Sequence, residues 1–295
     1  MESTAEDDKL AVFNRYRPRL FGLSYRMLGT PDEAEEIVQD AYIRWHTADT
    51  AAVENPEAWL VSITTRLSID RLRKASKQRE TYIGPWLPEP LMISTSPSPQ
   101  EDAELASSLS TAFILMLERL SPAERAVFLL HDVFDSSYAD IARIMDRKEP
   151  AVRQMLHRAR QRVRTDKPRF EPDRAEHRKL IERFSRAAYT SDETALLDLF
   201  SPDISVITDG GGKVTAARKI VRGLHKVIRI FTIAIPPAAD RLAWKFVDIN
   251  GEPGIVEFLD GEPFAANTFE VENGKISRLY RIMNPDKLKL LKNLS

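Results

Sequence analysis

The sequence of 295 residues predicts two all-α domains, the second with a helix-turn-helix, followed by an α+β cone domain. Three observations predict this fold class. Apolar residues recur at helical spacing through most of the chain up to Arg164. A proline-rich stretch interrupts this pattern near residue 90. Alternating, strand-like runs separated by turn residues dominate the last hundred residues or so.

Composition limits the possible functions. The chain is 43% hydrophobic and 29% charged, as in globular proteins, and it has no cysteine, which excludes disulfides, thiolate catalysis and Cys-based zinc sites. The N-terminus lacks the basic start and apolar stretch of a secretory signal, and no apolar run has the length of a membrane span. We expect a cytoplasmic protein without membrane contact, and nothing in the pattern requires a cofactor or a metal.

The first domain is expected over residues 8–79 and carries an acidic helix early. Thr30 as N-cap, Pro31 and Glu33 predict a capping box at the start of this helix. Ala34, Ile37, Val38, Ala41, Tyr42 and Trp45 form its apolar face, and Glu35, Glu36, Gln39 and Asp40 its polar face. Taken alone, the acidic face is a solvated surface, although a protein partner could use it.

A basic helix follows in the same domain. Asn55 is expected to cap it, and Trp59, Leu60, Ile63, Leu67 and Leu72 to form its buried side. Its later half carries six cations and one acid: Arg66, Arg71, Arg73, Lys74, Lys77 and Arg79 against Asp70. A DNA-binding surface would explain this concentration of charge.

A linker is expected over residues 80–104, where five prolines favour an extended chain. A plain tether would not need the apolar residues Tyr82, Ile83, Trp86, Leu87, Leu91 and Met92. Because their exposure would be unfavourable, we expect residues 82–91 to pack on a neighbouring domain.

The second domain, residues 105–170, contains the helix-turn-helix pattern. A short apolar-periodic segment from Tyr138 to Met145 is followed by a polar break at Asp146, and a second helix begins at Glu149. The outer face of that helix carries Arg153, Gln154, His157, Arg158, Gln161 and Arg162, which suit phosphates and base edges in a major groove. An ordinary helical corner is the alternative, but ten Lys/Arg against three Asp/Glu from Arg143 to Arg169 favour nucleic acid.

The third domain, residues 175–295, reads as two helices followed by strands of a curved antiparallel sheet, with a hairpin at 272–275. Such cones often enclose a pocket, where Asp198, Asp209, Asp248 or Glu257 could act as a general base. His177 and His225 are expected to be surface or core residues. The run Asp209 to Lys213 lacks the spacing of a P-loop, so a turn or contact loop is expected.

Three stretches resemble bacterial sigma factors. DEAEEIVQDAYIRWH resembles the polymerase-binding helix, and NPEAWLVSITTRLSIDRLRK resembles the helices that melt and read the minus-10 element. LSPAERAVFLLHDVFDSSYADIARIMDRKEPAVRQMLHRARQRVR is similar to the domain that reads the minus-35 element. Their order and spacing are those of the extracytoplasmic-function group of the sigma-70 family.

The resemblance implies roles for named residues. The polymerase-binding set is Asp32, Glu35, Glu36, Gln39 and Asp40. The minus-10 set is Asn55, Trp59, Arg66, Arg71, Arg73, Lys74 and Lys77, helped by the loop 47–55. The minus-35 set is Arg147, Lys148, Arg153, Gln154, His157 and Arg158. Arg66 and Asp146 depart from the usual Asn and Gly.

The third domain resembles the SnoaL-like fold that ends a SigJ-like subgroup of these factors. That subgroup carries WLPEP, DGGGK-type and NPDKL motifs, here residues 86–90, 209–213 and 284–288. The resemblance implies regulatory contacts by Trp86, Pro88, Asp209, Gly210, Gly211, Lys213, Asn284, Pro285 and Asp286.

The implied function is promoter recognition and transcription initiation, without catalysis, in partnership with core RNA polymerase and promoter DNA. A small-molecule ligand of the third domain, which would modulate activity, is left open. The alternatives are a cone-fold enzyme acting on small molecules and a ligand-responsive helix-turn-helix repressor. The acidic helix favours the sigma factor, because an ordinary repressor does not need it.

Overall fold

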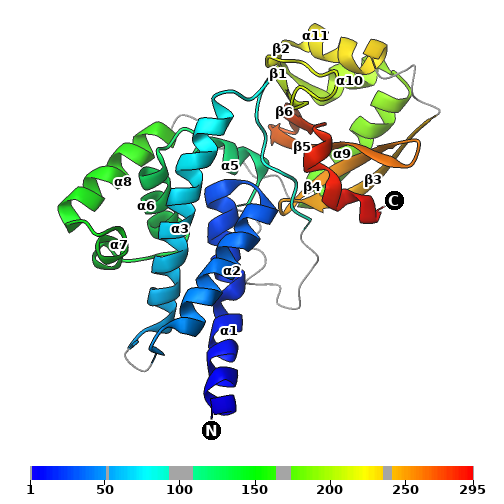
Figure 1. The fold of residues 1–295 in the computed structure, drawn as a ribbon. Helices are drawn as coiled ribbons and strands as arrows, with labels where there is room; N and C mark the ends of the chain where they lie inside the picture. The colour runs from blue at the N-terminus through cyan, green and yellow to red at the C-terminus, as the bar shows by residue number, and fades with distance from the viewer. Residues whose placement is uncertain (1, 51–52, 93–108, 164–173, 235–240, 295) are drawn as a thin grey trace. The chain divides into compact units, whose positions relative to one another are not determined.

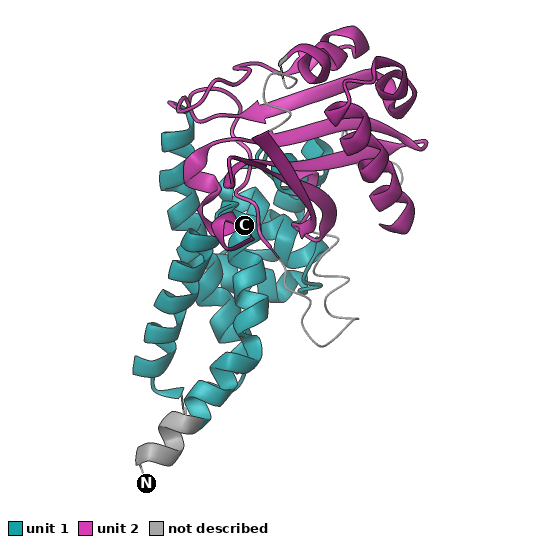
Figure 2. Cartoon of the chain, turned by 90° about the vertical axis from the view of Figure 1, so that its right-hand side faces the viewer, with its two compact units in different colours: residues 1–80, 114–166 teal, residues 81–113, 167–295 magenta. Residues whose placement is uncertain are grey.

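The computed structural model describes residues 2–50, 53–92, 109–163, 174–234 and 241–294. The chain forms two compact units (Figure 2). Unit 1 comprises residues 1–80 and 114–166, and unit 2 comprises residues 81–113 and 167–295. Each unit has its own core of buried apolar side chains. The described part of the expected linker, up to residue 92, therefore belongs largely to unit 2. Its apolar residues are buried or half-buried as expected, except Ile83, which is 51% exposed and corrects the prediction at that position.

Three helices form the first part of unit 1 (Figure 1): α1 (Glu2–Leu28), α2 (Pro31–Thr47) and α3 (Pro56–Arg79). The apolar side of α2 is buried as its periodicity predicts, with Ile37 and Trp45 at 2% exposure. The ring centroids of Trp45 and Trp59 lie 5.5 Å apart and join α2 to α3. The acidic and basic helices are thus held side by side by one apolar core.

The two predicted N-caps have different outcomes. Asn55 accepts a hydrogen bond from the amide of Ala58 at 3.0 Å, which confirms its capping role. The capping box predicted at Thr30 is wrong, because the Thr30 side chain makes no capping hydrogen bond. Glu33 instead lies 3.7 Å from Arg71 of α3, so the carboxylate is drawn toward a neighbouring helix.

The helix-turn-helix is confirmed. Unit 1 continues through α6 (Pro122–Asp132), α7 (Tyr138–Met145) and α8 (Glu149–Val163), while the boundary between units falls inside α5 (Thr111–Leu117). Asp146 ends α7 in the left-handed conformation, with φ 51°, which Asp tolerates better than most residues. Val152 and Leu156 of α8 are buried, so the opposite, basic face of this helix is exposed.

Unit 2 is built from helices and one six-stranded sheet. The helices are α9 (Arg174–Tyr189), α10 (Glu193–Leu199) and α11 (Leu224–Arg229), followed by a π-helical turn, η3 (Ile230–Ala234). The strands are β1 (Phe200–Asp209), β2 (Val221–Arg222), β3 (Leu242–Ile249), β4 (Glu252–Leu259), β5 (Glu262–Glu272) and β6 (Lys275–Ile282). The 3-10 turns η5 (Pro285–Lys287) and η6 (Lys289–Leu294) follow.

The strand order is β2-β1-β6-β5-β4-β3. All neighbours are antiparallel except β1 and β6, which run parallel with Asp209 opposite Ile282, so the expected all-antiparallel sheet is corrected at this pair. The difference arises because the chain returns to β1 only after building β3, β4 and β5. The hairpin predicted at 272–275 is confirmed, with positive φ at Asn273 and Gly274.

The core of unit 2 lies between the helices and one face of the sheet. Phe184 of α9 contacts Phe200, Phe231 and Phe269, with ring centroids 5.8, 5.1 and 5.2 Å away. Register shifts within β4 and β5 bend the sheet, as β-bulges do. The expected α+β domain, with helices followed by a curved sheet, is confirmed.

Candidate functional site

The acidic face of α2 is accessible. Asp32, Glu36, Gln39 and Asp40 are exposed, and Glu35 is half-buried. Glu35 pairs with Arg17 of α1. The five predicted residues therefore lie on one surface of unit 1, with their carboxylates partly neutralised from neighbouring helices.

An apolar residue on this surface was missed by the sequence analysis. Ile43, one turn after Gln39 and Asp40, is 58% exposed. An isoleucine on the polar side of an amphipathic helix is the signal that could have identified it. A large apolar side chain beside acidic groups is typical of a protein-binding surface.

The basic face of α3 is only partly free for DNA. Arg73, Lys74 and Lys77 are exposed. Arg71 is half-buried and its guanidinium lies 2.6 Å from Glu36, a hydrogen bond that raises the pKa of Arg71. The loop at 47–55 includes two residues outside the described part of the chain.

Arg66 is engaged by the helix-turn-helix. Its Nε donates to the carbonyl oxygen of Ile144 at 3.0 Å, and Nη2 lies 3.5 Å from the carbonyl oxygen of Arg143. These are among the last carbonyls of α7, which have no partner within the helix. A residue assigned to the minus-10 set therefore caps the first helix of the minus-35 domain in this form of unit 1.

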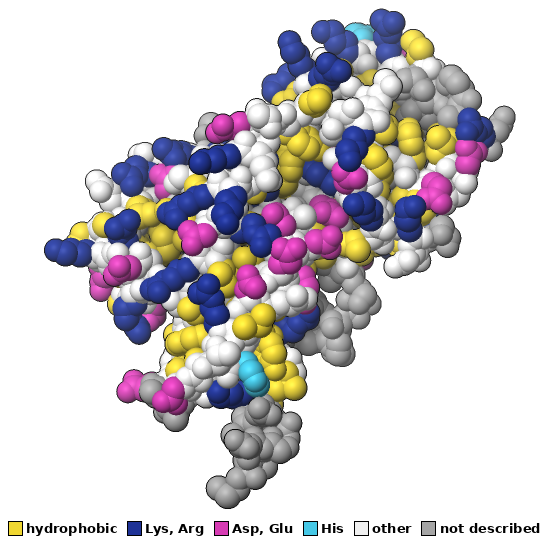
Figure 3. All heavy atoms as spheres, viewed as in Figure 1, with side chains coloured by type: hydrophobic (Ala, Val, Ile, Leu, Met, Phe, Trp, Pro, Cys, Tyr) yellow, Lys and Arg dark blue, Asp and Glu magenta, His cyan; other side chains and the backbone are white. Residues whose placement is uncertain are grey.

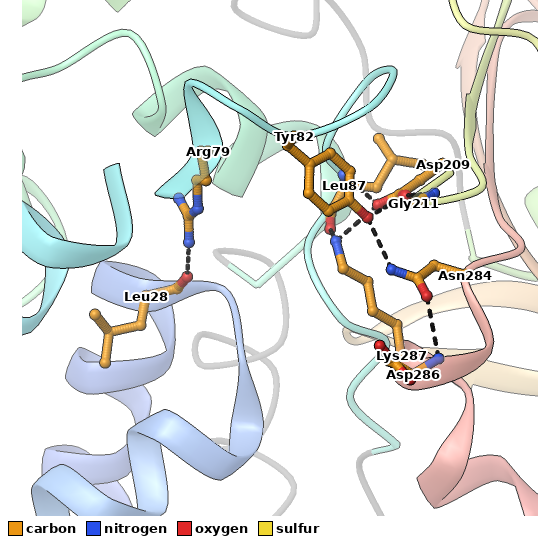
Figure 4. Close-up of polar contacts among 9 residues, drawn as sticks. All are labelled: Leu28, Arg79, Tyr82, Leu87, Asp209, Gly211, Asn284, Asp286 and Lys287. Atoms are coloured by element: carbon orange, nitrogen blue, oxygen red, sulfur yellow. Dashed lines mark hydrogen bonds and ion pairs between the residues drawn. The ribbon is translucent and has the colours of Figure 1, made fainter. Parts of the chain in front are cut away.

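A buried charge network joins the same two parts of unit 1. Arg125 of α6 is 1% exposed, donates to the carbonyl oxygen of Arg26 at 2.9 Å and pairs with Glu118. Arg79 of α3 lies 2.6 Å from Glu118 and donates to the carbonyl oxygen of Leu28 (Figure 4). Burial alone would raise the pKa of Glu118, but the charges of Arg125 and Arg79 lower it below its ordinary value.

The outer face of α8 and the turn before it present the predicted minus-35 residues. Arg147, Lys148, Arg153, Gln154, His157 and Arg158 are all exposed. Arg153 lies 3.1 Å from Glu149 and over the ring of Tyr138 at 4.7 Å, contacts that hold the side chain without burying it. Arg158 is 3.6 Å from Glu124, so its charge is partly balanced.

The three predicted regulatory motifs meet at Asp209, the last residue of β1. Its carboxylate is fully buried and accepts hydrogen bonds from the Tyr82 hydroxyl at 2.5 Å, the Leu87 amide at 2.9 Å and the Gly211 amide at 3.1 Å. Lys287 lies 2.7 Å away. We call Tyr82, Leu87, Asp209, Asn284 and Lys287 the linker clamp (Figure 4).

Lys287 holds the linker through several contacts at once. Its Nζ donates to the carbonyl oxygen of Leu87 and lies 4.5 Å from the ring centroid of Trp86 and 5.1 Å from that of Tyr82. Asn284 donates to the Tyr82 hydroxyl at 2.9 Å. Burial, and then Asp209, raise the pKa of Tyr82, so the hydroxyl remains a donor.

The clamp differs from the predicted set in its members. Trp86, Pro88, Asp209, Gly210, Gly211 and Asn284 lie at or near it, but Lys213, Pro285 and Asp286 are exposed, with Lys213 paired to Asp286. Tyr82, Leu87 and Lys287 were not in the set. Lys287 sits in the NPDKL motif, yet nothing in the sequence indicates that this lysine is buried.

Gly211 is required by the close approach of the linker. Its φ is 58°, and a Cβ there would lie 2.4 Å from Nδ2 of Asn284 and 3.1 Å from the Tyr82 hydroxyl. Any side chain would therefore both strain the backbone and displace the clamp.

A second anchor holds the far end of the linker. The amide of Leu91 donates to Oδ1 of Asn250 at 2.7 Å, and the amide of Asn250 donates to the Leu91 carbonyl oxygen at 2.8 Å. Asn250 is fully buried and also reaches Thr111 at 3.3 Å. The two anchors bind the backbone amides of Leu87 and Leu91. Proline has no N–H, so the prolines at 85, 88 and 90 reduce the number of other linker amides that need a hydrogen-bond acceptor.

The cavity that α9 and η3 form with β3 and β4 is small. It measures about 30 Å³ and is lined by aromatic residues and Glu257. This is room for a water molecule or two, whereas small-molecule sites have about 300 Å³ or more. The Glu257 carboxylate is held by Arg281 at 2.7 Å and Asn267 at 3.0 Å, so both oxygens are occupied.

The remaining polar candidates form no reactive cluster. Asp198 pairs with Arg183 at 3.0 Å and Asp248 with Arg174 at 2.6 Å. His225 is exposed. His177 is buried beside an open groove of about 600 Å³ between α9 and the β5–β6 hairpin, and burial lowers its pKa. Within the described residues, no group of His, Asp and Glu could hold a metal ion.

Known protein families match both parts of unit 1. The sigma-70 region 2 family matches residues 12–78, and the sigma-70 region 4 family matches residues 110–163. Nowhere in the described part of the chain is there a helix with the length and apolarity needed to cross a membrane.

Relatives match the chain nearly from end to end. The ECF RNA polymerase sigma factor SigJ of Mycobacterium tuberculosis is 35% identical over 292 residues, covering 95% of this chain and 93% of that protein. The probable ECF RNA polymerase sigma factor SigI of the same species is 28% identical over 289 residues, covering 96% and 95%. The crystal structure of SigJ superposes with a TM-score of 0.76 at 32% identity, covering 95% of this chain and 98% of that one.

The fold, the exposed helix-turn-helix and these matches define a transcription initiation factor. The chain belongs to the ECF family of RNA polymerase sigma factors and is of the SigJ type. Sigma factors bind core RNA polymerase and promoter DNA, and they are not enzymes.

Proposed function

We propose that α2 binds core polymerase, that α3 holds the minus-10 region and that α8 reads the minus-35 element. The observation that carries this proposal is the exposed outer face of α8, where Arg153, Gln154 and Arg158 project beside a left-handed turn. Bidentate contacts from such side chains discriminate between bases by about 1–3 kcal/mol each. The accessible acidic face of α2, with exposed Ile43, supports a protein partner at the other end of the same unit.

Run-off transcription with purified core polymerase tests this assignment. We expect transcript only when the protein is added, and we expect Arg153→Ala to reduce it about 5- to 100-fold on one minus-35 sequence but not on all of them. The matched control is Arg178→Ala, an exposed arginine of α9 in unit 2. Equal loss on every minus-35 variant, or no loss at all, would remove Arg153 from base recognition.

We further propose that unit 2 regulates initiation by holding the linker. The support is the linker clamp, in which a fully buried carboxylate and a buried lysine bind linker backbone and side chains. A linker fixed in this way cannot take another path until the clamp opens, and we propose that the clamp opens when polymerase is engaged.

A small-molecule ligand inside the cone is not part of this proposal. The small cavity of about 30 Å³ beside Glu257 and the pairing of both Glu257 oxygens support a packed interior at this place. The same observations weigh against the enzyme alternative, because a general base needs an accessible carboxylate and room for substrate.

A further inference from the structure

A continuous basic surface lies on unit 2, far in sequence from the helix-turn-helix. From Gly210 to Ala234 the chain has six Lys/Arg and no Asp/Glu. Lys213 is paired with Asp286. The other five, Arg218, Lys219, Arg222, Lys226 and Arg229, lie on or just before β2 and α11, and we call them the β2–α11 basic patch.

The fold turns these cations outward. Val227 and Ile228 of α11 are buried in the core of unit 2, so Lys226 and Arg229 lie on the opposite, exposed side of the helix. Arg222 is exposed on β2, the edge strand of the sheet, opposite Ser205 of β1. Figure 3 shows Lys and Arg side chains gathered with a histidine over the end of the molecule where Figure 1 labels α11 and β2.

The patch has no acidic partner within 4.0 Å among the described residues, unlike many cations elsewhere on unit 2. Three acidic groups at or on the adjoining α10 and β1 have partners of their own. Asp198 pairs with Arg183, Asp192 caps α10 through the Ala195 amide, and Asp203 accepts from the Ser201 hydroxyl at 2.8 Å. Five neighbouring cations without counter-charges create a positive potential that attracts a polyanion.

The chemistry of the patch favours duplex DNA. It contains no aromatic residue, whereas surfaces for single strands pair cations with aromatic rings on which bases stack. Lys and Arg on an exposed helix and edge strand suit phosphates, which are the main targets of sequence-independent protein–DNA contacts. Sigma factors bind promoter DNA, so duplex DNA is a polyanion that this chain is expected to meet.

We propose that the β2–α11 basic patch binds the phosphate backbone of duplex promoter DNA outside the minus-10 and minus-35 elements. The inference rests on the proposed promoter-binding function and adds a third, sequence-independent contact made by unit 2. Its role is to add affinity that falls with salt, without altering which promoter is chosen.

The test uses the holoenzyme and measures affinity for a promoter fragment as a function of salt. The patch variant is Arg222→Gln/Lys226→Gln/Arg229→Gln. The matched control, Arg241→Gln/Lys245→Gln/Lys292→Gln, removes three exposed cations, two of them at or beside β3 on the opposite edge of the sheet. Binding of each variant to core polymerase without DNA is measured separately.

The patch variant is expected to lower the magnitude of the slope of log affinity against log salt by about 2 to 3, with minus-35 preference unchanged. The control is expected to leave the slope as in the wild type. An unchanged slope with the patch variant overturns the inference while promoter binding itself stands. Weakened binding to core polymerase with an unchanged slope also overturns the inference. It would indicate that the patch binds an acidic surface of the polymerase. Failure of the wild-type holoenzyme to bind DNA contradicts the underlying promoter function.

Discussion

At the level of single residues, Asp209 and Lys287 form a charged pair withdrawn from solvent. Asp209 is fully buried, and the Lys287 side chain is 11% exposed. Removing one partner of such a pair leaves the other charge buried without compensation, which costs about 3–5 kcal/mol. Asp209 also accepts from the Leu87 amide, and Lys287 donates to the Leu87 carbonyl oxygen. Loss of the pair therefore weakens the hold on the linker as well as the sheet.

Asp209→Asn and Lys287→Met are each expected to destabilise unit 2 by about 3–5 kcal/mol, and the double variant by clearly less than the sum. Native-state hydrogen exchange of β1 and β6 peptides measures this loss. Lys213→Met is the control, because it breaks an exposed pair with Asp286 and should cost less than about 1 kcal/mol. Additive single effects would mean that the two residues do not act as a pair.

Some single-residue features could be predicted from the sequence, and long-range side-chain contacts could not. The exposed face of α8 could be predicted, because helical periodicity alone determines which side chains face outward. The pairing of Asp209 with Lys287 could not, because it joins residues 78 positions apart through the order of strands in the sheet. The same holds for Arg66, whose partner carbonyl lies 78 positions away on α7.

At the level of elements, α3 and α6 are joined through Glu118, whose carboxylate forms ion pairs with Arg79 and Arg125. The pKa of Glu118 in the folded protein lies below the ordinary value of 4.5. A carboxylate of this kind contributes stability that is fully present above its unfolded pKa and is lost as pH falls through its folded value. The contact between the two parts of unit 1 is therefore sensitive to acid.

Unit 1 is expected to lose stability as pH falls below the ordinary glutamate pKa of 4.5, and Glu118→Gln should flatten this dependence while lowering stability at pH 7. Thermal unfolding followed by tryptophan fluorescence measures both effects in a Trp86→Phe/Trp244→Phe background, which leaves Trp45 and Trp59 of unit 1 as the reporters. Glu57→Gln is a suitable control, because its pair with Arg19 is half exposed. A Glu118→Gln variant with the wild-type pH dependence would show that other carboxylates carry it.

Elements with strong local signals were predictable and weakly marked ones were not. The β5–β6 hairpin follows from an Asn-Gly turn between alternating runs. The two-residue strand β2 and the six-residue helix α11 are too short to show a period, and the parallel pairing of β1 with β6 depends on the path of the whole chain. The basic patch on β2 and α11 went unnoticed for the same reason.

At the level of the whole molecule, we propose that unit 2 holds the linker and must release it when polymerase is engaged. The chain has no cysteine, so an engineered disulfide can lock the linker without competing thiols. A Cβ at Gly212 would lie 3.1 Å from Cβ of Ile83, which is shorter than the roughly 3.5–4.5 Å of a disulfide, so the two backbone segments must move apart slightly for the bond to form. Gly212 has φ 72°, so a cysteine there carries a strain of about 1–2 kcal/mol.

The most direct measurement is run-off transcription by Ile83→Cys/Gly212→Cys with core polymerase, before and after reduction, with disulfide formation quantified by mass spectrometry. The two single-cysteine variants control for the substitutions and for the reductant. The account predicts that the oxidised double variant yields at least about tenfold less transcript and that reduction restores the level of the single variants. Equal transcript from the oxidised and reduced forms would contradict the claim that the linker must leave the clamp.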